Sequence, residues 1–109
     1  MLTIPASARL FLCKAPVNMR KSFEGLGKIV DEMFPGELMS GSFFIFLNRR
    51  REHIKVLYWD GDGFAIWYKR LEKGTFGGKT VDPSFFVRRD FLMMLEGVIP
   101  KRLALRFSP

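Results

Sequence analysis

Two clusters of basic residues are the part of this chain whose chemistry is easiest to interpret. One follows an apolar run and the other ends a later apolar run: Arg49, Arg50 and Arg51, then Lys69, Arg70 and Lys73. Guanidinium and ammonium groups gathered in this way repel one another unless a polyanion neutralises them, and they bind phosphates. The same pattern also fits a solvated loop tip and a solvated strand end, so the residues alone leave both interpretations open.

Three extended segments, at 42–47, 53–59 and 64–70, must position these cations. Their aromatic and β-branched residues predict strands, and the repeated Asp-Gly at 60–63 predicts a tight hairpin because glycine accepts positive φ. In an antiparallel meander, the 48–52 connection and the end of the third strand lie at the same end of the sheet. The sequence therefore predicts a cationic end, with Asp60 and Asp62 at the opposite end.

Arg20 and Lys21 form a second candidate phosphate contact. Asn18 is a good N-cap residue, so a helix is expected to begin at Met19 and to stop at Pro35-Gly36. Cations in a first helical turn are disfavoured by about 0.3–1 kcal/mol, whereas free amides beside two cations suit a phosphate. The alternative is that these cations pair with nearby carboxylates, as Arg20 can with Glu24 one turn later.

Aromatic side chains on the predicted sheet suggest a third kind of contact. Large apolar groups occupy both faces of the 42–47 and 53–59 strands, and any part left uncovered would be an interaction surface. Two helices and the tail would otherwise cover both faces, and the two outcomes are about even. Trp59 and Trp67 lie on neighbouring strands and are candidate stacking or partner-binding residues, although a core position is the commoner role.

The predicted fold class is α+β, a small antiparallel sheet packed by two helices. The sheet is a meander of about three to five strands, with a further strand at 9–13. The second helix contains Phe91 and Leu95 and ends at Gly97, and 84–87 is either an edge strand or the start of that helix. One domain is expected over 1–109, with its core at about 7–98 and a basic tail at 100–109.

Composition argues against an enzyme and for a polyanionic partner. The net charge is +7, and a basic surface around an apolar interior favours nucleic acid. One histidine, His53, and one cysteine, Cys13, cannot supply a metal site from His and Cys pairs, and the carboxylates have no metal-binding spacing. We expect no cofactor, no disulfide, no signal peptide and no membrane span, and therefore a cytoplasmic protein that joins the nucleoid when bound to DNA.

Three segments resemble the TnpB accessory proteins of the insertion sequence sixty-six (IS66) family of bacterial mobile elements. They are MRKSFEGL at 19–26, the block from Gly41 to Phe76 and MLEGV at 94–98. The middle block is the most specific, with its NRRR, IKVLYWDGDGF and KRLEKGTF runs. This family is distinct from the RNA-guided nuclease also called TnpB, which is several times longer and needs a carboxylate triad.

The resemblance implies a role in transposition beside a larger transposase and a second small accessory protein. It brings no catalytic residues, because the family has none agreed. Two hypotheses follow. The chain either binds DNA, at the element termini, through its cationic end, or docks the transposase through an aromatic face without touching DNA. The oligomeric state stays open.

Overall fold

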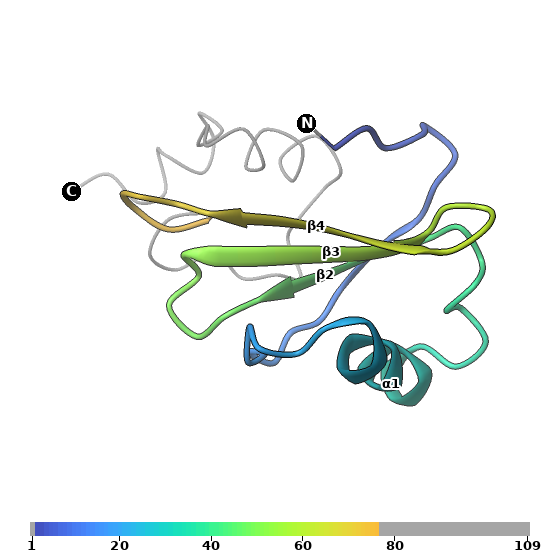
Figure 1. Cartoon of the computed structure of the whole chain (residues 1–109), viewed down its shortest axis with the longest axis horizontal. Coiled ribbons are helices and arrows are strands. Elements are labelled where there is room, and N and C mark those ends of the chain that lie inside the picture. Colours follow the sequence, from blue (N-terminus) through green and yellow to red (C-terminus); the bar gives the residue numbers. More distant parts are fainter. Residues whose placement is uncertain (1, 77–109) are drawn as a thin grey trace.

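A four-stranded sheet organises residues 2–76, which are the residues that this computed structural model describes (Figure 1). The strand order is β1-β2-β3-β4, and one helix, α1, packs below the sheet in the view of Figure 1. The elements are β1 (Leu10–Leu12), α1 (Phe23–Met33), β2 (Phe43–Leu47), β3 (His53–Trp59) and β4 (Phe64–Arg70). The class is α+β, as predicted.

The meander of β2, β3 and β4 is antiparallel and matches the expected strands within one residue. Phe43 pairs with Tyr58 at one end of the β2–β3 ladder, and His53 pairs with Arg70 at one end of the β3–β4 ladder. The Asp-Gly connection is a tight turn in which the Asp60 amide donates to the Gly63 carbonyl at 2.8 Å. Gly61 has φ +83°, which a residue with a side chain rarely adopts.

Strand β1 corrects the expectation of an all-antiparallel sheet. It runs parallel to β2, with Leu10 opposite Phe43 and Leu12 opposite Ile45. The reason is the connection: α1 lies between β1 and β2 in the chain, and a crossover of this kind joins parallel neighbours. The chain continues along β2 after β1 ends, because the Cys13 and Val17 amides donate to the Ile45 and Leu47 carbonyls, both at 2.9 Å.

Helix α1 begins four residues later than expected. Asn18 caps a separate turn instead: its side-chain oxygen accepts from the Arg20 amide at 2.8 Å and its carbonyl from the Lys21 amide at 3.1 Å. Ser22 occupies the N-cap position, and the helix ends at Met33, before Pro35 as predicted. The predicted helix ending at Gly97, the 84–87 segment and the 100–109 tail lie outside the described residues.

Both faces of β2 are buried along its whole length. On the α1 face, Phe44, Phe46 and Leu57 pack against Leu26 and Val30 of the helix. On the opposite face, a second cluster joins inward side chains of β2 and β3 to residues from both ends of the described chain: Phe43, Ile45, Leu47, Ile54, Val56, Leu2 and Phe76. The centre of the sheet is therefore covered rather than left as an open aromatic face.

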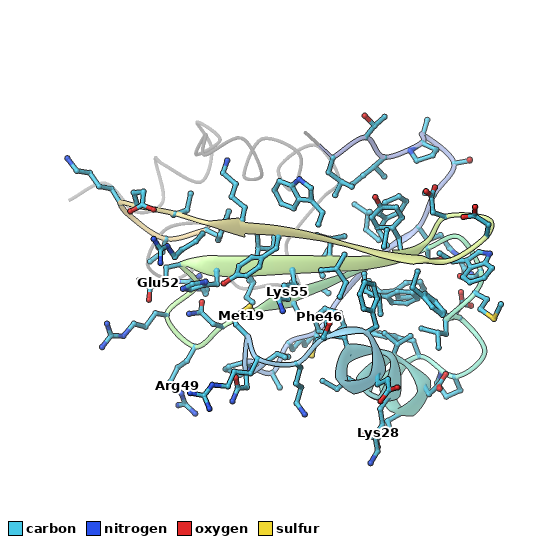
Figure 2. All side chains as sticks on the ribbon, viewed as in Figure 1. Met19, Lys28, Phe46, Arg49, Glu52 and Lys55 are labelled. Atoms are coloured by element: carbon cyan, nitrogen blue, oxygen red, sulfur yellow. The ribbon has the colours of Figure 1, made fainter. Side chains whose placement is uncertain are left out.

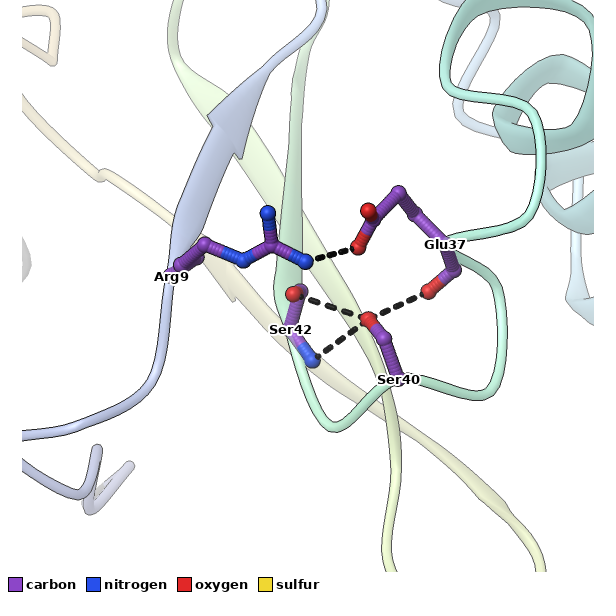
Figure 3. A network of polar contacts seen from close by, with 4 residues as sticks. All are labelled: Arg9, Glu37, Ser40 and Ser42. Carbon is purple, nitrogen blue, oxygen red and sulfur yellow. Dashed lines mark hydrogen bonds and ion pairs between the residues drawn. The ribbon is translucent and has the colours of Figure 1, made fainter.

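A polar network ties the residue before β1 to the connection between α1 and β2 (Figure 3). Arg9 forms an ion pair with Glu37, and Ser40 donates to the Glu37 carbonyl at 2.6 Å and contacts the Ser42 hydroxyl at 2.8 Å. The hydrogen bond from Arg9 is the main cause that lowers the pKa of the Glu37 carboxyl, and Ser40 adds to it. Within the described part of the chain, no helix is long and apolar enough to cross a membrane.

Candidate nucleic-acid interface

The two basic clusters lie at the same end of the sheet, as the meander predicted (Figure 1). The β2–β3 connection carries the arginines, and the chain leaving β4 runs beside it. The Leu71 amide donates to the Glu52 carbonyl at 2.8 Å, and the Phe76 amide donates to the Arg51 carbonyl at 2.6 Å. We call this region, defined by residues 48–53 and 69–73, the cationic end.

The three arginines of the connection are not equivalent. Asn48 organises the turn, because its carbonyl accepts from the Arg51 amide at 3.0 Å and its side-chain oxygen accepts from the amides of Glu52 and His53 at 2.9 and 3.0 Å. Arg49 and Arg50 occupy the exposed tip. Arg51 has φ +56° and is half-buried, and this burial lowers the pKa of its guanidinium. The tip arginines are therefore the more accessible cations of this connection.

The cations of β4 divide between the two faces of the sheet. Arg70 is opposite His53 on the α1 face, whereas Lys69 is opposite Ile54 on the other face. Arg70 also pairs with Glu72 at 3.1 Å, which reduces its local charge, and Lys73 is exposed in the segment that follows. The six predicted cations thus share one end of the sheet but do not form one flat surface.

Arg20 and Lys21 are held at the cationic end by a residue that the sequence prediction missed. The Lys55 ammonium donates to the carbonyls of Met19 and Lys21 at 2.9 and 2.8 Å, and it lies 5.1 Å from the centre of the Tyr68 ring. Lys55 is only 8% exposed, and Figure 2 shows it on β3 beside Met19. The available signal was a lysine facing Phe46 at an inward position of an apolar strand.

A groove of about 560 Å³ separates this clamped turn from the β2–β3 connection. One wall comes from residues 16–19 and the other from the connection, and the labelled Met19, Arg49 and Glu52 lie near that end of the sheet in Figure 2. The lining residues are Pro16, Val17, Asn18, Met19, Asn48, Arg49, Arg50, Glu52 and His53. The fold therefore brings the turn before α1 to the predicted arginine cluster.

Trp59 and Trp67 do not form a shared platform. They occupy opposite faces of the sheet, because Trp67 is opposite Val56 and Trp59 is opposite Phe64. Trp67 packs against the core cluster that contains Val56, and Trp59 makes an edge contact with Phe64, with 4.9 Å between ring centres. Any role in stacking or partner binding would have to be played by each indole separately.

A second groove, of about 380 Å³, lies between α1 and the sheet near the Asp-Gly hairpin. Its apolar lining includes Phe23, Leu57 and Phe64, and Phe23 is 47% exposed. Within residues 2–76, no group of three or more His, Cys, Asp or Glu side chains is placed to hold a metal ion. The two grooves are thus chemically distinct, because the first combines cationic and amide side chains with an apolar wall and the second is lined mainly by apolar groups.

Comparison with known proteins gives this geometry a biological setting. The family model described as IS66 Orf2-like protein matches residues 8–104, which is most of the chain. The chain belongs to the IS66 Orf2-like family. This membership agrees with the resemblance found in the sequence.

Two curated proteins of Sinorhizobium fredii (strain NBRC 101917 / NGR234) are similar to this chain. The one named "Uncharacterized protein y4jC" is 31% identical over 68 residues, which cover 62% of this chain and 58% of that protein. The one named "Uncharacterized protein y4hO" is 30% identical over 76 residues, which cover 70% of this chain and 66% of that protein. The matches thus span less than two thirds of either relative, and no solved structure matches the chain.

Proposed function

We propose that this protein is a non-catalytic DNA-binding accessory factor of transposition. One observation carries the proposal: three basic segments that are separate in the sequence, at 18–21, 49–51 and 69–73, converge on one end of the sheet. Concentrated charge of one sign is an electrostatic footprint of nucleic-acid binding. The element termini are the DNA that such a factor would serve, beside the cognate transposase and the second accessory protein.

The arginines at the exposed tip would make the strongest phosphate contacts, and Arg20, Lys21 and Lys73 would extend the contact on either side. Each phosphate neutralised on duplex DNA contributes about −0.9 to the slope of log K against log salt concentration. The double variant R49A/R50A should therefore flatten the slope by roughly 1.8. K28A, which removes one exposed cation from α1, is the control for a basic residue outside the cationic end and should leave the slope unchanged.

The measurement is fluorescence anisotropy of terminal-repeat duplex DNA between 50 and 300 mM salt, with the purified chain alone. A steep slope for the wild type that R49A/R50A reduces and K28A does not would support the proposal. A shallow slope, or an equal effect of both variants, would contradict it. Metal-dependent cleavage of the DNA by the chain alone would show that the protein is a nuclease instead.

A second candidate function is docking of the transposase without direct DNA binding. The apolar groove beside α1 favours it, because Phe23 is large, apolar and nearly half exposed at its rim. On this hypothesis, the chain shifts terminal DNA only when the cognate transposase is present. F23E should abolish that ternary complex, whereas R49A/R50A should leave it intact. The opposite pattern would exclude the docking function.

A further inference from the structure

The groove at the cationic end has the volume of a small-molecule binding site, although it is widely open to solvent. Its volume of about 560 Å³ lies within the range of roughly 300–1,000 Å³ that is typical of small-molecule sites. A duplex presents its phosphates on the outside of a convex rod, with the bases stacked inside. Such a rod would contact the rim arginines and leave the interior of the groove empty.

The walls of the groove combine apolar side chains with one fixed aromatic ring. Pro16, Val17 and Met19 form the apolar side. His53 also lines the groove, and the Nδ1 of its ring is hydrogen-bonded to the Tyr68 hydroxyl at 2.6 Å. A ring held in place in this way is a preorganised surface for stacking, and histidine is among the side chains on which unpaired bases stack.

Hydrogen-bond donors dominate the polar part of the groove. The side-chain oxygens of Asn18 and Asn48 accept hydrogen bonds from backbone amides. The NH₂ group of each side chain is therefore the one that remains to donate to a ligand. Arg49 and Arg50 add guanidinium donors at the rim, and Glu52 supplies an acceptor. Donors of this kind suit phosphate oxygens and base carbonyls, and the carboxylate suits a base amino group.

We infer that this groove accommodates an unpaired nucleotide, so that the cationic end binds single-stranded DNA in preference to duplex. The base would stack on His53 between the apolar wall and the amides, with its phosphate at Arg49 and Arg50. The inference rests on the proposed DNA-binding function and adds the form of DNA that the site selects.

The test compares a labelled single strand with the duplex of the same sequence, by anisotropy at a fixed 100 mM salt. We expect the wild type to bind the single strand at least tenfold more tightly. H53A should weaken single-strand binding by roughly 5- to 150-fold, the equivalent of about 1–3 kcal/mol for one stacked base, and should weaken duplex binding much less. Y68F, which keeps the ring under Lys55 but removes the hydroxyl that holds His53, should lower single-strand affinity to a smaller extent.

A second measurement does not depend on the variants folding. Strands carrying 2-aminopurine at successive positions report stacking, and we expect the fluorescence of one position to change on binding to the wild-type chain. Equal affinity for single strand and duplex, or no 2-aminopurine response, would overturn the inference. If duplex binding still depends on Arg49 and Arg50 in that case, the proposed function survives; if neither form of DNA binds, the proposed function fails as well.

Discussion

Lys55 is a buried lysine whose charge is met by two backbone carbonyls and the ring of Tyr68. A buried ammonium is tolerated only when such partners compensate for its lost hydration. The residue therefore ties β3 to the turn that carries Arg20 and Lys21. Lys55 thus connects a strand of the hydrophobic core to the basic surface. We regard it as a residue that positions this turn rather than as a DNA ligand.

We expect K55M to lower the free energy of unfolding by about 1–3 kcal/mol, because two partly buried hydrogen bonds to backbone carbonyls lose their donor. The same change should speed hydrogen exchange of the amides at 18–21 and weaken DNA binding. The exposed Lys28 offers the control K28M, which should change none of these properties. Unaltered exchange at 18–21 in K55M would show that the clamp does not order the turn.

Cys13 makes the free energy of unfolding depend on pH in the alkaline range. Its thiol is buried, and burial is the main cause that raises its pKa, while a hydrogen bond to the Ala15 carbonyl opposes the shift. The folded state thus keeps this proton to a higher pH than the unfolded state, whose thiol titrates at about 8.5. The stabilisation is complete below that pH and is lost as pH rises towards the folded pKa.

Denaturant unfolding of the wild type and C13A between pH 7 and 10 measures this contribution. The difference in unfolding free energy between the two proteins should shrink steadily above about pH 8.5, because only the wild type releases the thiol proton on unfolding. A difference that stays constant over this range would mean that burial does not perturb the thiol. Thiol reagents should also react slowly with the native wild type.

At the scale of elements, α1 contains a glycine that its surroundings do not require. A methyl group on Gly27 would lie 3.8 Å from the nearest Leu38 side-chain carbon, an ordinary van der Waals distance. G27A should therefore stabilise the protein by roughly 0.5–1 kcal/mol through helix propensity and a less flexible unfolded chain. A lower thermal midpoint for G27A than for the wild type would indicate a closer contact than the structure shows.

The elements with strong local signals were predictable from the sequence. The β2–β3–β4 meander follows from runs of aromatic and β-branched residues and an Asp-Gly turn, and both kinds of signal are local. The direction of β1 was not predictable, because a three-residue strand carries no information about the neighbour with which it pairs. The start of α1 was misplaced because Asn18 caps a turn and a helix equally well.

The candidate site was predictable only in part, because some of its features follow from local patterns and others from long-range contacts. The grouping of Arg49–Arg51 with Lys69–Lys73 followed from strand direction, which the local pattern supplies. The clamp by Lys55 and the approach of residues 16–19 to the connection depend on the packing of β1 and α1 on the sheet, which are long-range contacts. Side-chain alternation then separated Lys69 from Arg70, and Trp59 from Trp67, across the two faces.

At the scale of the whole molecule, charge is separated along the sheet. Asp60 and Asp62 lie at the hairpin end, and the strand between them and the cationic end has seven residues, or about 23 Å. This distance exceeds the screening length of about 8 Å at physiological ionic strength. We therefore expect D60N/D62N to change DNA affinity by less than about twofold at 150 mM salt, despite the rise in net charge.

The comparison with R49A/R50A in the same binding assay separates local contact from overall charge. If affinity follows net charge alone, D60N/D62N will bind DNA more tightly by a margin comparable to the loss in R49A/R50A. That result would mean that the protein attracts DNA as a diffuse cation and that no specific end of the sheet is used.

The parallel pairing of β1 with β2 also sets the order in which the chain can fold. During synthesis β1 leaves the ribosome before β2. The β1–β2 ladder can form only after β2 has been synthesised, because Leu10 pairs with Phe43. The β2–β3–β4 meander closes only short loops, so we expect it to form early and β1 and α1 to dock on it afterwards. Because residues 16–19 follow β1 and form one wall of the groove, we expect the groove to be completed only when β1 docks on the meander. A nascent chain therefore displays its arginine tip before it has a pocket beside it.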